Sequence, residues 1–243
     1  MYRVGVTVTM RRESLRHVPG TFSIAARDPD ANVFGAAVTT GTVSVGATCP
    51  YVSEAAAVVT QAFTKTDHGR AGVERAAAGE RVDDALSAVL DDDEHAAYRQ
   101  VHGVGFDSEF AFTGEECTEW CGHRIGDDHT VAGNILTGPD VLDATAEAYE
   151  STDGDMADRL VSALEAGEAA GGDERGELSA ALLIHAPEPE FYHNLRVDLS
   201  ERPVDDLRTL LEEARRAQEQ LVSETEGAET DYPPSVFDFG VKY

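Results

Sequence analysis

Lysine is nearly absent from this chain. Lys65 and Lys242 are the only lysines among its 19 basic residues, which face 46 aspartates and glutamates and leave a net charge of −27. So negative a chain repels the phosphates of nucleic acids and of anionic membranes, which argues against non-specific binding to either. An acidic, lysine-poor surface is also typical of proteins adapted to very high salt, where screening over a few Å removes most self-repulsion. The composition therefore indicates a halophilic source.

Long apolar runs and cysteines are also scarce. No apolar run approaches the roughly 18–20 residues that a membrane-spanning helix needs. The three cysteines, Cys49, Cys117 and Cys121, are too sparse and odd in number for a disulfide framework. Cys117 and Cys121 have His123 nearby, but no second pair of ligands completes a zinc site. We therefore expect a cytoplasmic protein with reduced thiols, no metal and no cofactor.

The first 20 residues differ from the remainder of the chain. They contain four arginines and one acid, Glu13, and they lack the apolar core of a secretory signal. Three interpretations stay open: a propeptide removed before Thr21, a disordered tail, or a start assigned too far upstream, with the natural chain beginning near Val18. We expect residues 21–222 to form one domain. Residues 223–243 are acidic and then aromatic, and we expect them to drape over it.

Strands and helices are predicted in alternating blocks. Alternating or continuous apolar runs predict strands over residues 21–26 and 33–38 (a hairpin), 55–63, 98–106 and 109–112 (a second hairpin), 129–136, 179–185 and 194–199. Residues 28–32, Asp-Pro-Asp-Ala-Asn, supply the turn chemistry of the first hairpin, because Pro fixes φ and Asp and Asn bond back to nearby amides. Helical spacing of apolar residues predicts helices over residues 70–79, 82–90, about 140–149, 156–166 and 203–221. Residues 65–69, 114–126 and the Gly-rich run 167–176 are expected to be loops, and the acidic run 91–94 is expected to be a solvated loop. This order lacks a regular βαβ rhythm and favours an α+β fold with two face-to-face antiparallel sheets and helices outside.

Thr21 is the residue that carries the first chemical hypothesis. It stands at the head of the first hairpin, directly after Gly20, where an N-terminal nucleophile would lie. Its hydroxyl would attack an acyl carbon, and its own α-amine, with an unperturbed pKa near 8, would take the proton. Ser23 is next on the same strand face and could hydrogen-bond within the site, and the charges of Arg27 and Asp28 could tune the amine. An ordinary strand threonine is the alternative interpretation.

Several motifs together resemble a known family. They are TFSIAARDPDANVFGAAVTT, VVTQAF, FTGEECTEWCGHRIGDDHTVAGNILTGPDVLDATAEAYE and EAGEAAGGDERGELSAALLI. They resemble the DUF1028 family, a family of unknown function, over residues 21–211. The resemblance implies the Ntn-hydrolase superfamily and its four-layer αββα sandwich, in a member of haloarchaeal type. Gly20-Thr21 also resembles the junction at which proteasome β subunits cleave themselves, whereas in family members the TFSI segment commonly follows the initiator Met.

The chain departs from the family pattern at three places. His68-Gly69-Arg70 replaces a Tyr-Gly-Pro-like loop, and Trp120-Cys121-Gly122-His123 replaces Trp-Ala-Gly-His. Arg175-Gly176-Glu177-Leu178-Ser179-Ala180 loses the basic and amide side chains of an Arg-Gly-Lys-Gln-Ser-Ala pattern. The Asp and Lys that tune the proteasome nucleophile have no clear match by spacing.

The resemblance also implies where the remaining site residues lie. Thr21 would end a central strand and face a cleft between the sheets, with the Gly133 amide and the Asn134 side chain forming an oxyanion hole. His123 would orient the substrate or relay a proton. The substrate side would include Ser23, Arg27, Asp28, His68, Asp173 and Arg175. The alternatives are a plain Gly-Asn turn at 133–134, a capping loop histidine at 123, and a surface ion pair between Asp173 and Arg175.

The sequence supports two hypotheses for function. The first is a cytoplasmic amidohydrolase that cleaves a small C–N amide bond through Thr21 after its amine is freed. Its expected partners are a small-molecule amide substrate and, in a homodimer, a second copy, but neither nucleic acid nor membrane. The second is a non-catalytic protein of the same fold that binds a small polar ligand or a protein partner.

Overall fold

The computed structural model describes residues 20–225, with side chains up to residue 221. The predictions for the 1–19 leader and for most of the C-terminal tail lie outside these residues. The chain begins with the expected hairpin, β1 (Thr21–Asp28) and β2 (Val33–Thr40), paired antiparallel. Asp28 Oδ1 accepts hydrogen bonds of 3.0 Å from the amides of Asp30 and Ala31, which closes the turn. The turn chemistry of the sequence is thus confirmed.

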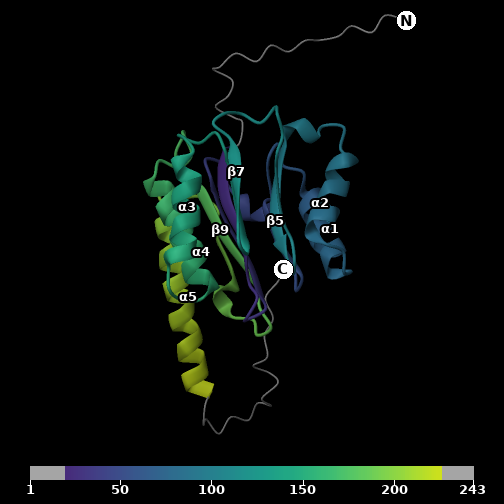
Figure 1. Cartoon of the computed structure of the whole chain (residues 1–243). Helices are drawn as coiled ribbons and strands as arrows, with labels where there is room; N and C mark the ends of the chain where they lie inside the picture. The colour runs from purple at the N-terminus through teal and green to yellow at the C-terminus, as the bar shows by residue number, and fades with distance from the viewer. Residues whose placement is uncertain (1–19, 226–243) are drawn as a thin grey trace, which may run out of the picture.

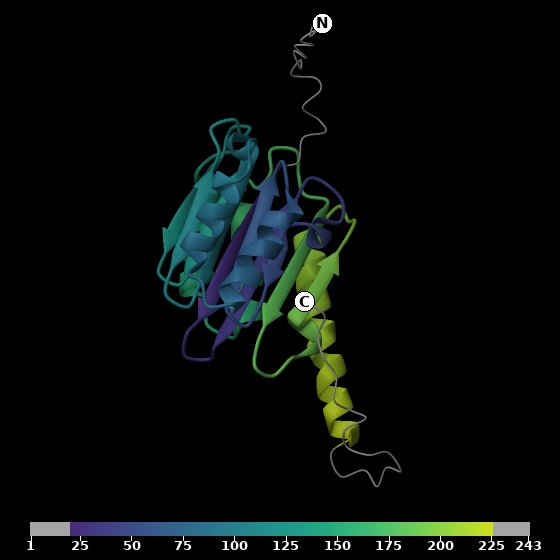
Figure 2. The same cartoon turned by 90° about the vertical axis from the view of Figure 1, so that its right-hand side faces the viewer.

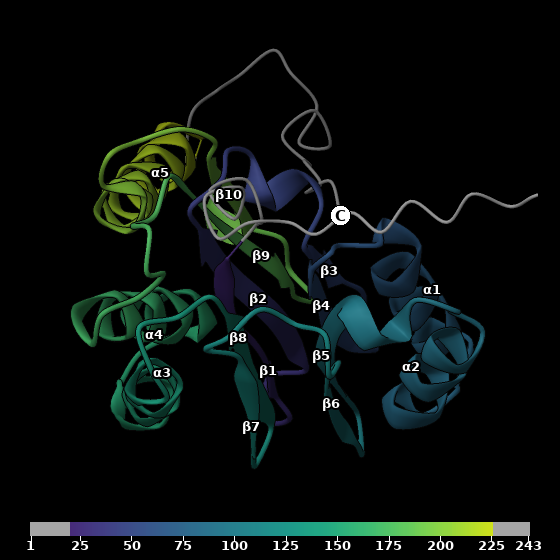
Figure 3. The same cartoon turned by 90° about the horizontal axis from the view of Figure 1, so that it is seen from above.

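The hairpin forms the centre of a six-stranded antiparallel sheet in the order β10-β9-β2-β1-β8-β7. The other strands are β7 (Gly122–Gly126), β8 (His129–Asn134), β9 (Ser179–His185) and β10 (Asn194–Val197). A four-stranded antiparallel sheet in the order β3-β4-β5-β6 faces it (Figures 1 and 3). It consists of β3 (Pro50–Val52), β4 (Ala56–Ala62), β5 (Arg99–Gly105) and β6 (Glu109–Thr113). Ala and Val side chains of both sheets form the apolar part of the layer between them.

The helices cover the outer faces of the two sheets. On the six-stranded sheet lie α3 (Asp140–Ser151), α4 (Met156–Ala169) and α5 (Pro203–Thr225), whose leucines share a core with Phe22, Ile24 and Leu182. On the four-stranded sheet lie α1 (Thr66–Ala77) and α2 (Val82–Asp91), in front of the sheets in Figure 2. The predicted α+β class with two antiparallel sheets and outer helices is confirmed. Between residues 20 and 225, no helix is long and apolar enough for a membrane span.

Three predicted loops contain regular structure instead. α1 begins at Thr66, so most of the expected loop 65–69 is its first turn, where Asp67 favours the positive end of the helix. Residues 122–126 form the edge strand β7, whose backbone pairs with β8 although its sequence has little strand character. α4 continues to Ala169, and its Gly167 lies so close to the Phe22 ring that a larger side chain has no room there.

Candidate functional site

Thr21 occupies the first position of the central strand. It pairs with Thr40 of β2 on one side and with Asn134 of β8 on the other. The Thr21 Oγ1 donates a hydrogen bond of 3.2 Å to Thr40 Oγ1, and Thr40 Oγ1 donates in turn to the carbonyl oxygen of Gly20. With Gly20 attached, Thr21 is only 2% exposed. Its hydroxyl therefore belongs to a short relay that ends on the carbonyl of the preceding peptide bond.

The Asp173–Arg175 pair holds the same carbonyl from a second direction. Arg175 Nε and Nη2 donate to Asp173 at 2.9 and 2.6 Å, and Nη2 also lies 3.3 Å from the Gly20 oxygen. Asp173 is 3% exposed and accepts the Gly41 amide at 2.9 Å. A Cβ at position 20 would come within 2.7–2.8 Å of Asp173, Arg175 and Ile135, so the site accommodates only glycine there. The pair thus lies beside Thr21 and is not a surface ion pair.

Ser23 reaches across to the four-stranded sheet. Its hydroxyl donates to Gln61 Oε1 of β4 at 2.6 Å and lies 2.8 Å from His102 Nε2 of β5. His102 Nδ1 lies 2.9 Å from Thr130 Oγ1, back on β8. All four side chains are fully buried, so each needs these partners. These polar contacts fix how the two sheets lie against each other two residues along β1 from Thr21.

Gln100 of β5 is the centre of this polar network. Its Oε1 accepts from Gln61 Nε2 at 2.8 Å and from Asn134 Nδ2 at 3.0 Å, while its Nε2 donates to Gly133 O at 2.9 Å. The same nitrogen lies 2.9 Å from Thr113 Oγ1, which contacts His123 Nδ1 at 2.9 Å. The structure therefore brings Asn134, Gly133 and His123 into one network, next to Thr21.

Both histidines of the network are held neutral. Burial, with added repulsion from His123 whenever that ring is protonated, lowers the pKa of His102 to about 3. Burial and the charge of Arg124 also lower the pKa of His123. At neutral pH the two rings therefore act as hydrogen-bonding groups rather than as cations. A neutral His123 can accept or donate a proton, as the relay hypothesis requires.

Two predicted site residues lie at the opposite end of β1. Arg27 donates to Asp128 at 2.5 Å and to Gly105 O at 2.7 Å, and Asp28 closes the hairpin turn. Arg27 lies six residue steps along the strand from Thr21, which is about 20 Å at the usual rise. The prediction that Arg27 and Asp28 tune the Thr21 amine is therefore corrected, because the strand holds both residues too far from that amine.

His68 lies in a separate buried cluster. Its Nε2 is 3.2 Å from Asp93 Oδ2, which also accepts from Arg99 Nε at 2.8 Å and lies 3.5 Å from Lys65 Nζ. Burial raises the pKa of Asp93, but the Arg99 hydrogen bond, the His95 amide and Lys65 outweigh it and bring it to about 2. Asp93 is 8% exposed, so the prediction of a fully solvated 91–94 loop is wrong at this residue. His68 contacts this carboxylate rather than Thr21.

The described residues include no cluster of three or more His, Cys, Asp and Glu side chains that could hold a metal ion. Burial raises the pKa of Cys49 to about 11, so that thiol stays protonated.

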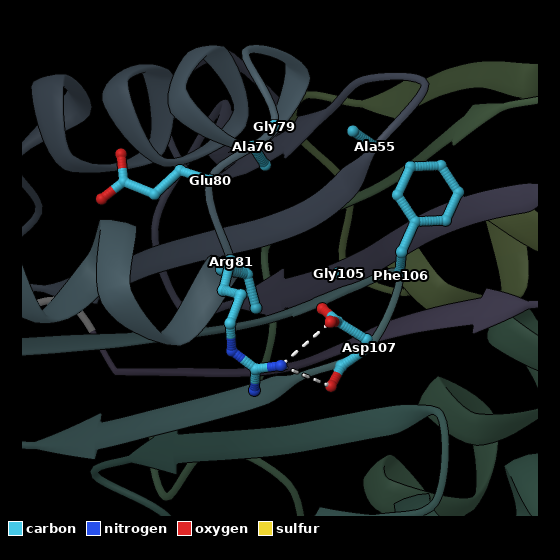
Figure 4. Close-up of a pocket in the computed structure, with 9 residues that line it drawn as sticks. Ala55, Ala76, Gly79, Glu80, Arg81, Gly105, Phe106 and Asp107 are labelled. Atoms are coloured by element: carbon cyan, nitrogen blue, oxygen red, sulfur yellow. Dashed lines mark hydrogen bonds and ion pairs between the residues drawn. The ribbon is translucent and has the colours of Figure 1, made fainter.

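A groove of about 210 Å³ lies at the far end of the sheets, beside Phe106 and the Arg81–Asp107 ion pair (Figure 4). A larger cleft of about 680 Å³ separates α1 and β3 from β9 and β10. Neither lining includes Thr21, so the expected cleft at Thr21 stays a prediction.

Sequence reasoning missed the three central members of the polar network, Gln61, Gln100 and His102. Each is a polar residue directly beside an apolar one in its strand, and each is fully buried. That interruption was the available signal. It does not tell which residue on another strand satisfies the polar group, because such partners are far apart in the sequence.

Comparison with known proteins places the chain in a family. No curated protein matches it. A crystal structure of protein SPO2555 from Silicibacter pomeroyi, which is assigned to DUF1028, is similar to it with 32% sequence identity and a TM-score of 0.75. The similarity covers 80% of this chain and 86% of that one. The model of DUF1028, a family of unknown function, matches residues 21–207, and the chain therefore belongs to the DUF1028 family.

Proposed function

We propose that this protein is an N-terminal-nucleophile amidohydrolase that cleaves a small C–N amide bond through Thr21. In this proposal the two sheets and their outer helices are the αββα sandwich of the Ntn hydrolases, in a cytoplasmic protein of haloarchaeal type. The observation that carries it is the position of the Thr21 hydroxyl. It starts the central strand and is hydrogen-bonded through Thr40 to a carbonyl that Arg175 also holds.

The reaction begins once the Thr21 amine is free. The amine takes the hydroxyl proton, and Oγ1 attacks the carbonyl carbon of the substrate amide. The Asn134 side-chain amide and the Gly133 backbone amide stabilise the negative oxygen of the tetrahedral intermediate. The intermediate collapses, the C–N bond breaks, and the amine passes its proton to the leaving nitrogen. Water then hydrolyses the ester on Thr21, which releases a carboxylic acid and restores the hydroxyl.

The network behind the site sets the geometry of the oxyanion donors. Asn134 Nδ2 gives one of its hydrogens to Gln100 Oε1, which leaves the other for the substrate oxygen. Arg175 contacts the Gly20 carbonyl and is held by Asp173, and the pair would bind a polar part of the substrate once the leader is absent. His123 reaches the same network through Thr113 and would relay protons. No cofactor enters this scheme.

A label that needs both groups of an N-terminal threonine tests the proposal. An α′,β′-epoxyketone captures a hydroxyl and a free amine of one residue in a single ring. We expect the purified protein to begin at Thr21 by intact mass and to gain one label there. Thr21→Ala should take up none, whereas Thr48→Ala, which changes an exposed threonine, should be labelled fully. A protein that keeps its leader and takes up no label would contradict the proposal.

One observation favours the second candidate function. Thr21 is 2% exposed while Gly20 is attached, so the chain in this form offers a substrate no access to the hydroxyl. A protein that kept its leader would therefore be a non-catalytic member of the fold that binds a small polar ligand or a protein partner. Intact mass separates the two candidates.

A further inference from the structure

The six-stranded sheet extends past the four-stranded sheet on the β10 side. β3 is an edge strand of the smaller sheet, and it packs against β2 and β9 of the larger one. β10 follows β9 and therefore lies one strand farther out (Figure 3). The cleft of about 680 Å³ lies at this offset, with α1 and β3 on one wall and β9 and β10 on the other. Its volume is within the range of about 300–1,000 Å³ that is usual for small-molecule sites.

The inner face of β10 supplies polar side chains to this cleft. Arg196 pairs with Ala181 of β9, and Asn194 pairs with Leu183. Ala181 and Leu183 belong to the apolar layer between the sheets, and residues directly opposite each other on neighbouring strands share a face. Arg196 and Asn194 therefore lie on the inner side, whereas Leu195 packs into the core that α5 covers. One wall of the cleft thus carries a guanidinium and a carboxamide.

Two glycines allow close packing of side chains in the cleft. A Cβ at Gly46 would lie 2.7 Å from Ala181 Cβ and 2.9 Å from Arg196 Cγ, so the stem of Arg196 lies against bare backbone there. A Cβ at Gly69 of α1 would lie 2.1 Å from the ring of Tyr51, which therefore lies against the helix backbone. Packing this close limits the conformations of both side chains. A ligand that binds between them has less side-chain freedom to restrict, which favours binding.

Arginine dominates the charge of the lining. The charged residues there are Arg70, Glu74 and Arg196, in a chain whose acids outnumber its bases by 46 to 19. Arg70 lies 3.5 Å from Asp67, but both side chains are more than half exposed, and such a pair contributes little. Among residues 20–221, Asp198 accepts from Nε and Nη2 of Arg196 at 3.2 and 2.7 Å, which leaves Nη1 to bind a ligand. The cleft therefore favours an anion.

We propose that this cleft binds a small organic carboxylate with an apolar body. The carboxylate oxygens accept hydrogen bonds from Arg70 and Arg196, because a planar guanidinium matches the geometry of a carboxylate. The apolar body lies against Val52 and the ring of Tyr51, which line the same cleft. Thr21 is not part of the lining, so this site is separate from the proposed active site. It binds its ligand whether or not Thr21 is catalytic.

Two probes of nearly equal shape isolate the contribution of the charge. They are 2-naphthoate and its neutral analogue 2-naphthamide, titrated calorimetrically against the full protein. Because hydrogen bonds to a charged group are about twice as strong as those between neutral groups, we expect the acid to bind at least about tenfold tighter. Acetate has the charge without the apolar body, and it should bind at least about tenfold more weakly than 2-naphthoate.

Variants of the lining test where the acid binds. Arg70→Gln and Arg196→Gln should each weaken 2-naphthoate binding about tenfold and remove most of the preference over the amide. Glu74→Gln removes a negative charge from the lining and should strengthen binding about two- to fivefold, a gain that unfolding cannot cause. Arg216→Gln is the matched control, because the Arg216 side chain is 61% exposed on α5 and that of Arg70 is 60% exposed. It should leave binding unchanged, and circular dichroism verifies that each variant is folded.

Three results would overturn the carboxylate site: equal binding of the acid and the amide, no binding of 2-naphthoate, or equal loss in Arg216→Gln. A further variant separates this cleft from the proposed active site. Thr21→Ala should bind 2-naphthoate as tightly as the unmodified protein does. Loss of binding in that variant would place the ligand at Thr21 and reject the cleft as its site.

Discussion

At the scale of single residues, the site depends on uncharged polar side chains that are buried from solvent. Ser23, Gln61, Gln100 and His102 are each fully buried, and each has a hydrogen-bond partner on another strand. A buried polar group without its partner would cost about 1–3 kcal/mol, so the network favours one alignment of the two sheets over any shifted one. The same groups hold Asn134 beside Thr21. Stability and the geometry of the candidate site therefore depend on the same residues.

His102 makes the stability of the fold depend on pH. Its pKa is about 3 in the folded protein and about 6.5 in an unfolded chain, so between these values only the unfolded chain binds the proton. Stability contributed by the neutral ring is complete above pH 6.5 and is lost as the pH falls toward 3. The slope reaches about 1.4 kcal/mol per pH unit. We expect His102→Gln to flatten the pH dependence of urea unfolding between pH 6.5 and 4, whereas the exposed-residue control His95→Gln should behave like the unmodified protein. Parallel curves for all three would contradict the assignment.

At the scale of elements, Asp93 joins the start of α1 to the start of β5. It contacts Lys65 and His68 on one side and Arg99 on the other, and Arg99 also holds the carbonyl of Phe63. Removing one member of a buried charge pair leaves the others without compensation. We expect Asp93→Asn to lower the free energy of unfolding by about 2–3 kcal/mol, because Lys65 is partly solvated. The neighbouring exposed Asp92→Asn should change it by less than about 0.5 kcal/mol in the same denaturant titration. Equal effects would show that Asp93 is an ordinary loop residue.

The elements also show what could be predicted from the sequence. The Thr21–Asp28 hairpin strand, Ser179–His185 and α2 lie where the periodicity predicts them, because their patterns depend on neighbours close in the chain. The acidic run around Asp93 predicts a solvated loop, because the partner that buries this residue, Arg99, cannot be identified from that run. The inter-sheet partners of Gln100 escape prediction for the same reason. The residues of β1 and β8 that the proposed mechanism uses could be predicted from the sequence, because they lie within the family motifs.

At the scale of the whole molecule, the few basic side chains include arginines that join one element to another. Arg208 of α5 binds Glu165 and Asp158 of α4, and Arg215 of the same helix binds Asp155 and Asp158. Arginine suits these contacts because its planar guanidinium pairs with two carboxylate oxygens at once. These pairs neutralise only a small part of a net charge of −27. The excess surface acids repel one another, and that repulsion opposes the compact state.

Salt should therefore stabilise this protein. The Debye length falls from about 10 Å at 0.1 M to about 3 Å at 1 M, so KCl removes repulsion between exposed acids and hardly affects buried pairs. We expect the thermal midpoint to rise from 0.1 to 2 M KCl. The exposed-acid triple variant Asp91→Asn, Asp92→Asn and Glu94→Gln should be more stable than the unmodified chain at 0.1 M, and this advantage should vanish at 2 M. Salt acting through general exclusion from the surface would raise both proteins in parallel at every concentration, and that outcome would reject self-repulsion as the cause.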